Sequence, residues 1–234
     1  MPTAATQADM IIVSGVRSAL ASAADPTKAP GMQAYMKSAL PFRGVQKAKR
    51  TRLFREVFGS RPMESEPVWA ATVRELWHDA AFREERYAAL DLTGYRLYRG
   101  HQRPEVLPLY EELVGTGAWW DFVDEIAGRR IGPILRAFPD QVAPVMRAWA
   151  TDDDLWRRRT AILCQLGARA AMDPDLLENC IEPNLADREF FIRKAIGWAL
   201  RDYAWYDPDW VRSWVERHAD HLSPLSYREA TKHL

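Results

Sequence analysis

The sequence holds only two cysteines, Cys164 and Cys180, among its 234 residues. Neither belongs to a CxxC pair or to a cysteine–histidine cluster, which argues against a disulfide framework and against a zinc site. The five histidines also lack the spacing of metal ligands. We therefore expect no metal and no cofactor, and a reducing cytoplasm is the expected compartment.

The sequence also lacks the segments that mark membrane and secreted proteins. No apolar run reaches the roughly 18 residues that a membrane helix needs, and residues 1–8 lack the charged and apolar blocks of a signal peptide. Glycine-rich nucleotide loops and the HExxH and GxSxG motifs are absent too. The familiar nucleotide-binding and hydrolase motifs therefore offer no candidate site.

Charge is present in both signs, and the formal net charge is zero. This zero is an average over unlike segments. Residues 26–63 contain nine basic side chains and one acid, whereas acids outnumber bases by thirteen to six over residues 64–125. Such segregation can build a basic face on a neutral molecule. A solvated helix face is the alternative interpretation of the basic segment.

Runs of alternating β-branched residues are missing, and almost every periodic segment follows a helical spacing. Asp173, Asp207 and Ser223 each precede a proline, which puts a good N-cap before proline at the first helical position. We expect helices at 8–23, 31–38, 45–58, 66–78, 81–98, 104–114, 118–136, 139–150, 154–170, 174–183, 187–205, 208–219 and 223–232.

Short loops between helices of this length predict antiparallel packing of sequence neighbours. About six such pairs, each of about 35 to 40 residues, match the dimensions of HEAT-like repeats. We therefore expect an all-α protein, an α-solenoid formed by residues 1–234 as a single domain, with a concave binding face. A globular helical bundle is the alternative.

Some side chains lie off the apolar stripe that joins a helix to the core. In the helix that begins near Trp119, the spacing puts Trp120 and Asp124 together on a different edge. An aromatic ring beside a carboxylate can form a site. The alternative is a tryptophan that packs under a neighbouring helix beside a solvated aspartate.

The helix that begins near Asp187 has a similar edge. Lys194, Trp198, Arg201 and Trp205 recur at i, i+4, i+7 and i+11, away from the apolar stripe. Cations that alternate with aromatic rings on one exposed face suit a nucleic-acid backbone with its sugars and bases. We therefore expect Lys194 and Arg201 to bind DNA.

Arg159 lies at the edge of the apolar stripe of the helix that begins near Asp154. An arginine near a core face needs an anionic partner, because burial of an unpaired charge is expensive. That partner is either a carboxylate, with Asp124 as one candidate, or a phosphate of a nucleic acid. A purely structural salt bridge is the alternative.

Five segments together resemble the AlkD family of bacterial DNA alkylation repair proteins. They cover nearly the whole chain in the right order: GMQAYMKSALPFRGV (31–45), WWDFVD (119–124), LWRRRTAILCQL (155–166), EFFIRKAIGWALRDY (189–203) and LSPLSYREATKHL (222–234). The resemblance implies a HEAT-like solenoid that binds double-stranded DNA with alkylated bases along its concave face. It also implies a monomeric protein, associated with the bacterial nucleoid in the cytoplasm and not with a membrane.

The resemblance further implies a monofunctional DNA glycosylase that excises N3- and N7-alkylated purines without strand cleavage. Carried over by motif, Asp124 is the catalytic carboxylate, and Trp120 and Trp198 flank the damaged nucleotide. Arg159 and Tyr35 resemble residues that contact DNA. Such a cationic purine already leaves easily, so one carboxylate that stabilises the sugar cation is enough, in contrast to the two carboxylates of ordinary glycosidases.

One position departs from the family pattern. Relatives often carry lysine after the QL of the Arg159 helix, where this chain has Gly167, and Arg169 is a candidate to replace that contact. Two other functions stay open from the residues alone. One is a DNA-binding protein of this fold without catalysis, and the other is a HEAT-like scaffold for a protein partner.

Overall fold

The structure is a computed structural model that describes residues 6–234, and every regular element among them is helical. It confirms the all-α prediction, with fourteen α-helices in the described part of the chain. The chain divides into two compact units, one up to His101 and one from Gln102 to Leu234. The single domain over residues 1–234 stays a prediction. The signal-peptide expectation rests partly on residues 1–5, which lie outside the described residues.

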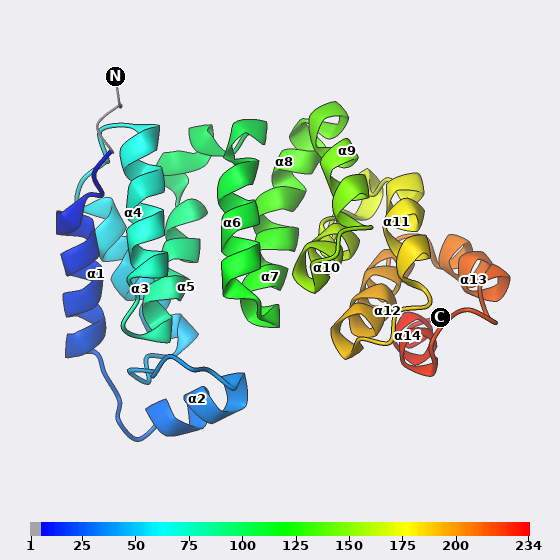
Figure 1. The fold of residues 1–234 in the computed structure, drawn as a ribbon, viewed down its shortest axis with the longest axis horizontal. Helices are drawn as coiled ribbons and strands as arrows, with labels where there is room; N and C mark the ends of the chain where they lie inside the picture. Colours follow the sequence, from blue (N-terminus) through cyan, green and yellow to red (C-terminus); the bar gives the residue numbers. More distant parts are fainter. Residues whose placement is uncertain (1–5) are drawn as a thin grey trace. The chain divides into compact units, whose positions relative to one another are not determined.

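The first unit is built from five α-helices and one short 3-10 helix. They are α1 (Met10–Ser22), α2 (Ala29–Met36), α3 (Lys47–Gly59), α4 (Glu66–His78), α5 (Arg83–Thr93) and η1 (Arg96–His101). Helices α1, α3, α4 and α5 pack against one another, whereas α2 belongs to the connection between α1 and α3 (Figure 1). Large apolar side chains such as Trp69 and Trp77 of α4 fill the core between them.

The second unit holds the other nine α-helices. They are α6 (Leu107–Gly117), α7 (Trp120–Ile126), α8 (Gly132–Ala137), α9 (Pro139–Trp149), α10 (Leu155–Leu163), α11 (Pro174–Ile181), α12 (Phe190–Ala204), α13 (Pro208–Arg217) and α14 (Pro224–Ala230). Short 3-10 helices lie at Pro104–Val106, Arg169–Ala171 and Glu182–Asn184.

Helices of the second unit pack on their sequence neighbours and on the next pair along the chain. Helix α10 contacts both α7 and α12, α9 contacts α11, and α12 contacts both α13 and α14 (Figure 1). This stacking is consistent with the helical repeats of an α-solenoid. The assignment of the pairs to HEAT-like repeats stays a prediction. Within the described residues, no helix has the length and apolar character to cross a membrane.

The predicted helix starts are confirmed at three positions. The carboxylates of Asp173 and Asp207 and the hydroxyl of Ser223 each accept a hydrogen bond from the backbone N–H three residues later. Proline follows each of them, at the first helical position. These caps satisfy N–H groups that the helix itself leaves unpaired, so local sequence alone determines where α11, α13 and α14 begin.

The helix expected at 118–136 contains a π-helical turn at Ala127–Ile131, which separates α7 from α8. Gly132 follows this turn, where the C-terminal end of α10 packs closely against the chain. A Cβ atom at Gly132 would lie 2.6 Å from the backbone oxygen of Cys164 at the end of α10. Turns of this type widen a helix locally and recur at functional sites. Here the turn comes directly after the helix that carries Asp124.

Candidate active site

Asp124 of α7 and Arg159 of α10 form a bidentate ion pair inside the second unit. The Nε atom of Arg159 donates to one carboxylate oxygen at 2.8 Å, and an Nη atom donates to the other at 2.9 Å. The side chains are 13% and 4% exposed, respectively. The position of Arg159 at the edge of its apolar stripe predicts an anionic partner, with Asp124 as one candidate, and the structure brings the two together. Parallel hydrogen bonds of this kind fix the plane of the carboxylate.

Arg159 is also fixed from the side of α12. Its second Nη atom donates to the backbone oxygen of Phe191, and the Phe191 ring lies 5.8 Å from the guanidinium carbon. This ring belongs to a triangle of aromatic side chains, with centroids 5.6 Å from Trp119 and 5.1 Å from Trp156. Helices α7, α10 and α12 therefore each contribute to the immobilisation of one arginine.

Two features of the surroundings of Asp124 shift its pKa in opposite directions. Burial raises the pKa of Asp124 above its ordinary value, and the hydrogen bonds and charge of Arg159 oppose this rise. The negative charge of Asp121 contributes to the rise in the pKa of Asp124. Each carboxylate oxygen accepts one bond from Arg159 and keeps a further acceptor position. The carboxylate can therefore still interact with a cation or a water molecule.

The other two predicted catalytic residues lie on the same helices as this centre. Trp120 is half-buried at the first position of α7, one helical turn before Asp124. Trp198 is half-buried on α12, seven residues after Phe191. Seven residues are almost two full turns, so Trp198 shares the helix face of Phe191. The predicted tryptophans and carboxylate thus come from elements that pack around α10.

The predicted DNA-binding cations of α12 have an internal partner that sequence reasoning missed. Lys194 donates to a carboxylate oxygen of Glu229 on α14 at 2.6 Å, and Arg201 donates to the other oxygen. Helix α14 comes this close because residue 197 is glycine: a Cβ atom there would lie 2.5 Å from the Cβ atom of Glu229. The two cations are therefore directed toward α14 and half-buried, so their role in DNA binding stays a prediction.

Gly167, where the resemblance to the AlkD family implies a lysine, has a structural role. Its φ of +74° is in the left-handed region that favours glycine, and its N–H donates to Asp202 of α12 at 2.7 Å. Arg169, the candidate replacement, is exposed nearby in sequence. A lysine at position 167 would be strained in this backbone conformation, which makes glycine the better fit to the turn after α10.

Tyr35 belongs to the first unit, on α2, where its side chain is 75% exposed. The loop that follows α2 is held by a buried carboxylate. Glu84 of α5 accepts hydrogen bonds from the backbone N–H groups of Arg43, Gly44 and Val45 at 2.9 to 3.1 Å. This clamp fixes the loop between α2 and α3, at residues 43–45, to α5.

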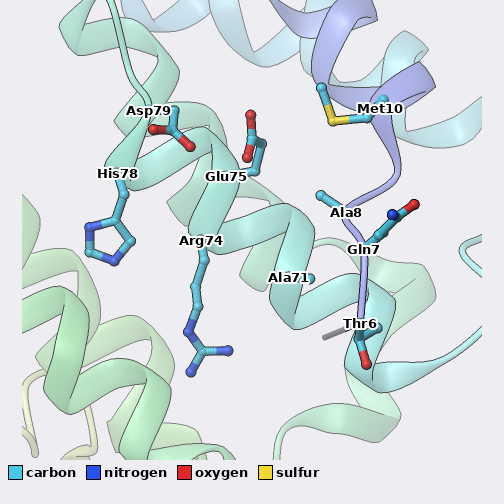
Figure 2. A pocket seen from close by; sticks show the side chains of 9 residues that line it. All are labelled: Thr6, Gln7, Ala8, Met10, Ala71, Arg74, Glu75, His78 and Asp79. Carbon is cyan, nitrogen blue, oxygen red and sulfur yellow. The ribbon is translucent and has the colours of Figure 1, made fainter. Parts of the chain in front are cut away.

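Two cavities lie away from these residues. One, of about 620 Å³, is in the first unit between α4 and the segment before α1. Figure 2 shows the Glu75 and Asp79 carboxyl groups side by side on one side of α4, with Arg74 and His78 on another. Burial and the neighbouring Asp79 raise the pKa of Glu75. The other cavity, of about 180 Å³, lies in the second unit beside α8, α9 and α11. None of the predicted site residues lines either cavity.

One group of side chains has the composition of a metal site. Ligand atoms of Glu178, Glu182 and His218 lie within 4.8 Å of one another. They already have protein partners, because Trp214 Nε1 donates to Glu178 at 2.9 Å and His218 Nε2 lies 3.4 Å from Glu182. These contacts explain their positions without an ion, and the expectation of no metal stays a prediction.

The comparisons with known proteins bear on this arrangement. The family model described as "DNA alkylation repair enzyme" matches residues 16–234. The chain belongs to this family. A search of curated proteins found no match.

A solved structure described as a predicted DNA alkylation repair enzyme from Enterococcus faecalis is also similar. It shares 28% sequence identity, with a TM-score of 0.78, over 90% of this chain and 96% of the other. The family match spans both units, so Tyr35 and the Asp124–Arg159 pair belong to one DNA alkylation repair sequence. Repair of alkylated DNA is therefore the function class, and DNA is the implied substrate.

Proposed function

We propose that the protein is a monofunctional DNA glycosylase of the AlkD type, which removes cationic N3- and N7-alkylated purines from duplex DNA. The observation that carries this proposal is a shielded carboxylate, Asp124, fixed by Arg159 in a chain of the DNA alkylation repair family. A fixed anion of this kind is suited to a reaction in which positive charge moves onto a sugar.

The chemistry of the leaving group determines which catalytic groups the protein must provide. An N3- or N7-alkylated purine carries a positive charge, so it departs as a neutral base and needs no acid. Asp124 stabilises the sugar cation that forms and orients the attacking water, while the indole faces of Trp120 and Trp198 favour positive charge. Arg159 holds the carboxylate in position and opposes its protonation. The reaction has no lysine nucleophile, so no strand cleavage accompanies it.

The proposed chemistry acts on the sugar and not on the base. Most glycosylases extrude the damaged base into a deep pocket. A carboxylate that acts on the sugar has no such requirement, so the proposed mechanism accommodates bulky adducts.

The test is release of free 7-methylguanine from a duplex that contains one such lesion. We expect release by the wild-type protein without strand breaks, and a loss of at least about a hundredfold in Asp124→Asn, since removal of one electrostatic stabiliser has effects of this size. Glu125→Gln is the matched control. It neutralises the next carboxylate of α7, which pairs with Arg129 and Arg130, and we expect full activity.

Two results would contradict the proposal. Absence of base release by the wild-type protein, with DNA binding retained, favours a non-catalytic DNA-binding protein. Full activity of Asp124→Asn would remove Asp124 from the mechanism. A protein that binds neither damaged nor intact duplex belongs to the scaffold class.

A further inference from the structure

Trp205 is the C-cap residue of α12, and it exposes a large apolar side chain to solvent. Its side chain is 72% exposed, although its ring lies against that of His233, with 4.7 Å between the centroids. Single exposed apolar residues are common on protein surfaces. An exposed indole braced by a second ring is a different feature, because it offers a flat, pre-positioned surface to a partner.

The position of Trp205 relates it to the proposed site. It follows Trp198 by seven residues and keeps helical backbone angles, with φ −67° and ψ −17°. It therefore lies on nearly the same face of α12, about 10.5 Å farther along the axis. A DNA strand that contacts both indole rings is therefore contacted at two points about 10.5 Å apart.

Trp198 and Trp205 form an aromatic strip along one face of α12. The charged side chains beside this strip favour aromatic stacking over contacts with phosphates. Arg201 and Lys194 flank the strip, and both are paired with Glu229. On the other side, Asp202 accepts the N–H of Gly167. The strip between these pairs presents rings without an unpaired charge from α12. Aromatic side chains stack on bases that are exposed. In an intact duplex neighbouring base pairs cover the base faces, so the apolar sugar faces are the parts of the strand that can bind such a surface.

We propose that Trp205 and His233 form an aromatic platform that binds the sugar faces of the DNA strand beside the damaged nucleotide. The proposal rests on the function proposed above, because that function places the damaged nucleotide at Trp198. The platform holds the strand while Asp124 acts on the lesion. It contributes to affinity and not to the chemical step.

The experiment measures binding of three duplexes that contain a stable abasic-site analogue. One extends at least eight base pairs on both sides of the analogue, and each of the other two ends one nucleotide from it, on one side or the other. We expect Trp205→Ala to bind the long duplex about tenfold more weakly, which is near the lower end of the cost of losing an aromatic contact to nucleic acid. We expect Trp205→Phe to restore most of the affinity and His233→Ala to lower it less.

Two readouts separate the platform from a structural role. The salt dependence of binding stays unchanged in Trp205→Ala because no phosphate contact is lost, and so does the single-turnover rate of base release at saturating protein. The matched control is Tyr206→Ala. Tyr206 is 52% exposed but stacks on Tyr203, and we expect wild-type affinity.

The decisive comparison is between wild type and Trp205→Ala on the truncated duplexes. If the platform binds the strand, wild type and Trp205→Ala have equal affinity for one of the two truncated duplexes. Unchanged affinity of Trp205→Ala for the long duplex overturns the proposal, and so does an equal loss on all three duplexes. Absence of base release by wild type would instead reject the glycosylase function, and the binding comparison would still decide whether the platform exists.

Discussion

Substitution of Arg159 by methionine tests the Asp124–Arg159 pair most directly. Methionine keeps much of the apolar volume of the arginine side chain and removes its charge. The change leaves Asp124, with a side chain 13% exposed, as a shielded carboxylate without its partner. It also leaves the backbone oxygen of Phe191 without its donor. Removal of one partner of a buried ion pair is strongly destabilising because the other charge stays desolvated.

The expected loss in the free energy of unfolding at pH 7 is about 3 kcal/mol, at the lower end for buried pairs because Asp124 keeps some solvent contact. For a chain of this size, that corresponds to a fall in melting temperature of about 6 to 12 °C. Urea unfolding measures the free energy. Arg129→Met is the matched control, since Arg129 is 72% exposed, and it should lose less than about 0.5 kcal/mol.

The pH dependence of Arg159→Met follows from the same pair. Arg159 opposes the rise in the pKa of Asp124 that burial causes, so its removal lets this pKa rise further. A carboxyl group with a raised pKa in the folded state binds its proton more tightly there than in the unfolded state. The stability deficit of the variant therefore shrinks as pH falls through the raised pKa.

In the proposed mechanism base release depends on ionised Asp124, so the acid limb of its pH profile should move to higher pH in Arg159→Met. Addition of Asp124→Asn to Arg159→Met should recover part of the lost stability, because no charge then stays buried and unpaired. Equal unfolding free energies for wild type and Arg159→Met, together with an unmoved acid limb, would refute this reasoning.

Three further predictions, from two variants, concern the contact between α12 and α14. Gly197→Ala places a Cβ atom 2.5 Å from that of Glu229, so it should lower the unfolding free energy by about 1–3 kcal/mol, measured by urea unfolding. The hydrogen bond from Lys194 lowers the pKa of Glu229. The stability from this bond is present above the ordinary carboxyl pKa and is lost as pH falls through the lower folded value, and Glu229→Gln should remove that dependence. Glu229→Gln should also release Lys194 and Arg201 and make duplex binding tighter and more salt-dependent; an unchanged salt slope would contradict this.

The helices could be predicted from the sequence because their signals are local. The expected range 66–78 coincides with α4, Glu66–His78, and proline after an N-cap residue predicts where α11, α13 and α14 begin. The apolar stripe of α12, from Ile192 to Tyr203, is buried as its spacing requires. The π-helical turn after α7 differs from the expected continuous helix, although Pro133, which directly follows Gly132, lacks a backbone N–H and interrupts the helical hydrogen-bond pattern there. The close approach of the Cys164 backbone oxygen to Gly132 is, in contrast, a property of the packed structure.

The candidate site could be predicted only in part. An arginine at the edge of an apolar stripe needs an anionic partner, and Asp124 is among the candidates. The third contact of Arg159 is with the backbone oxygen of Phe191, and any residue type can supply such an oxygen. The partner of Lys194 and Arg201 is Glu229, distant in sequence. Charge spacing on one helix shows which side chains share a face, but it does not show which helix covers that face.

The pairing of Lys194 and Arg201 changes how α12 is expected to bind DNA. Two unpaired cations between two tryptophans would make the helix a phosphate-binding element whose affinity falls steeply with salt. With Glu229 between them, their combined charge is reduced by one, and the rings of Trp198 and Trp205 are the groups left to contact the strand. Affinity from this helix should then depend on stacking more than on ionic strength. Salt dependence should arise mainly from exposed cations elsewhere, such as Lys47, Arg52 and Arg55 of α3.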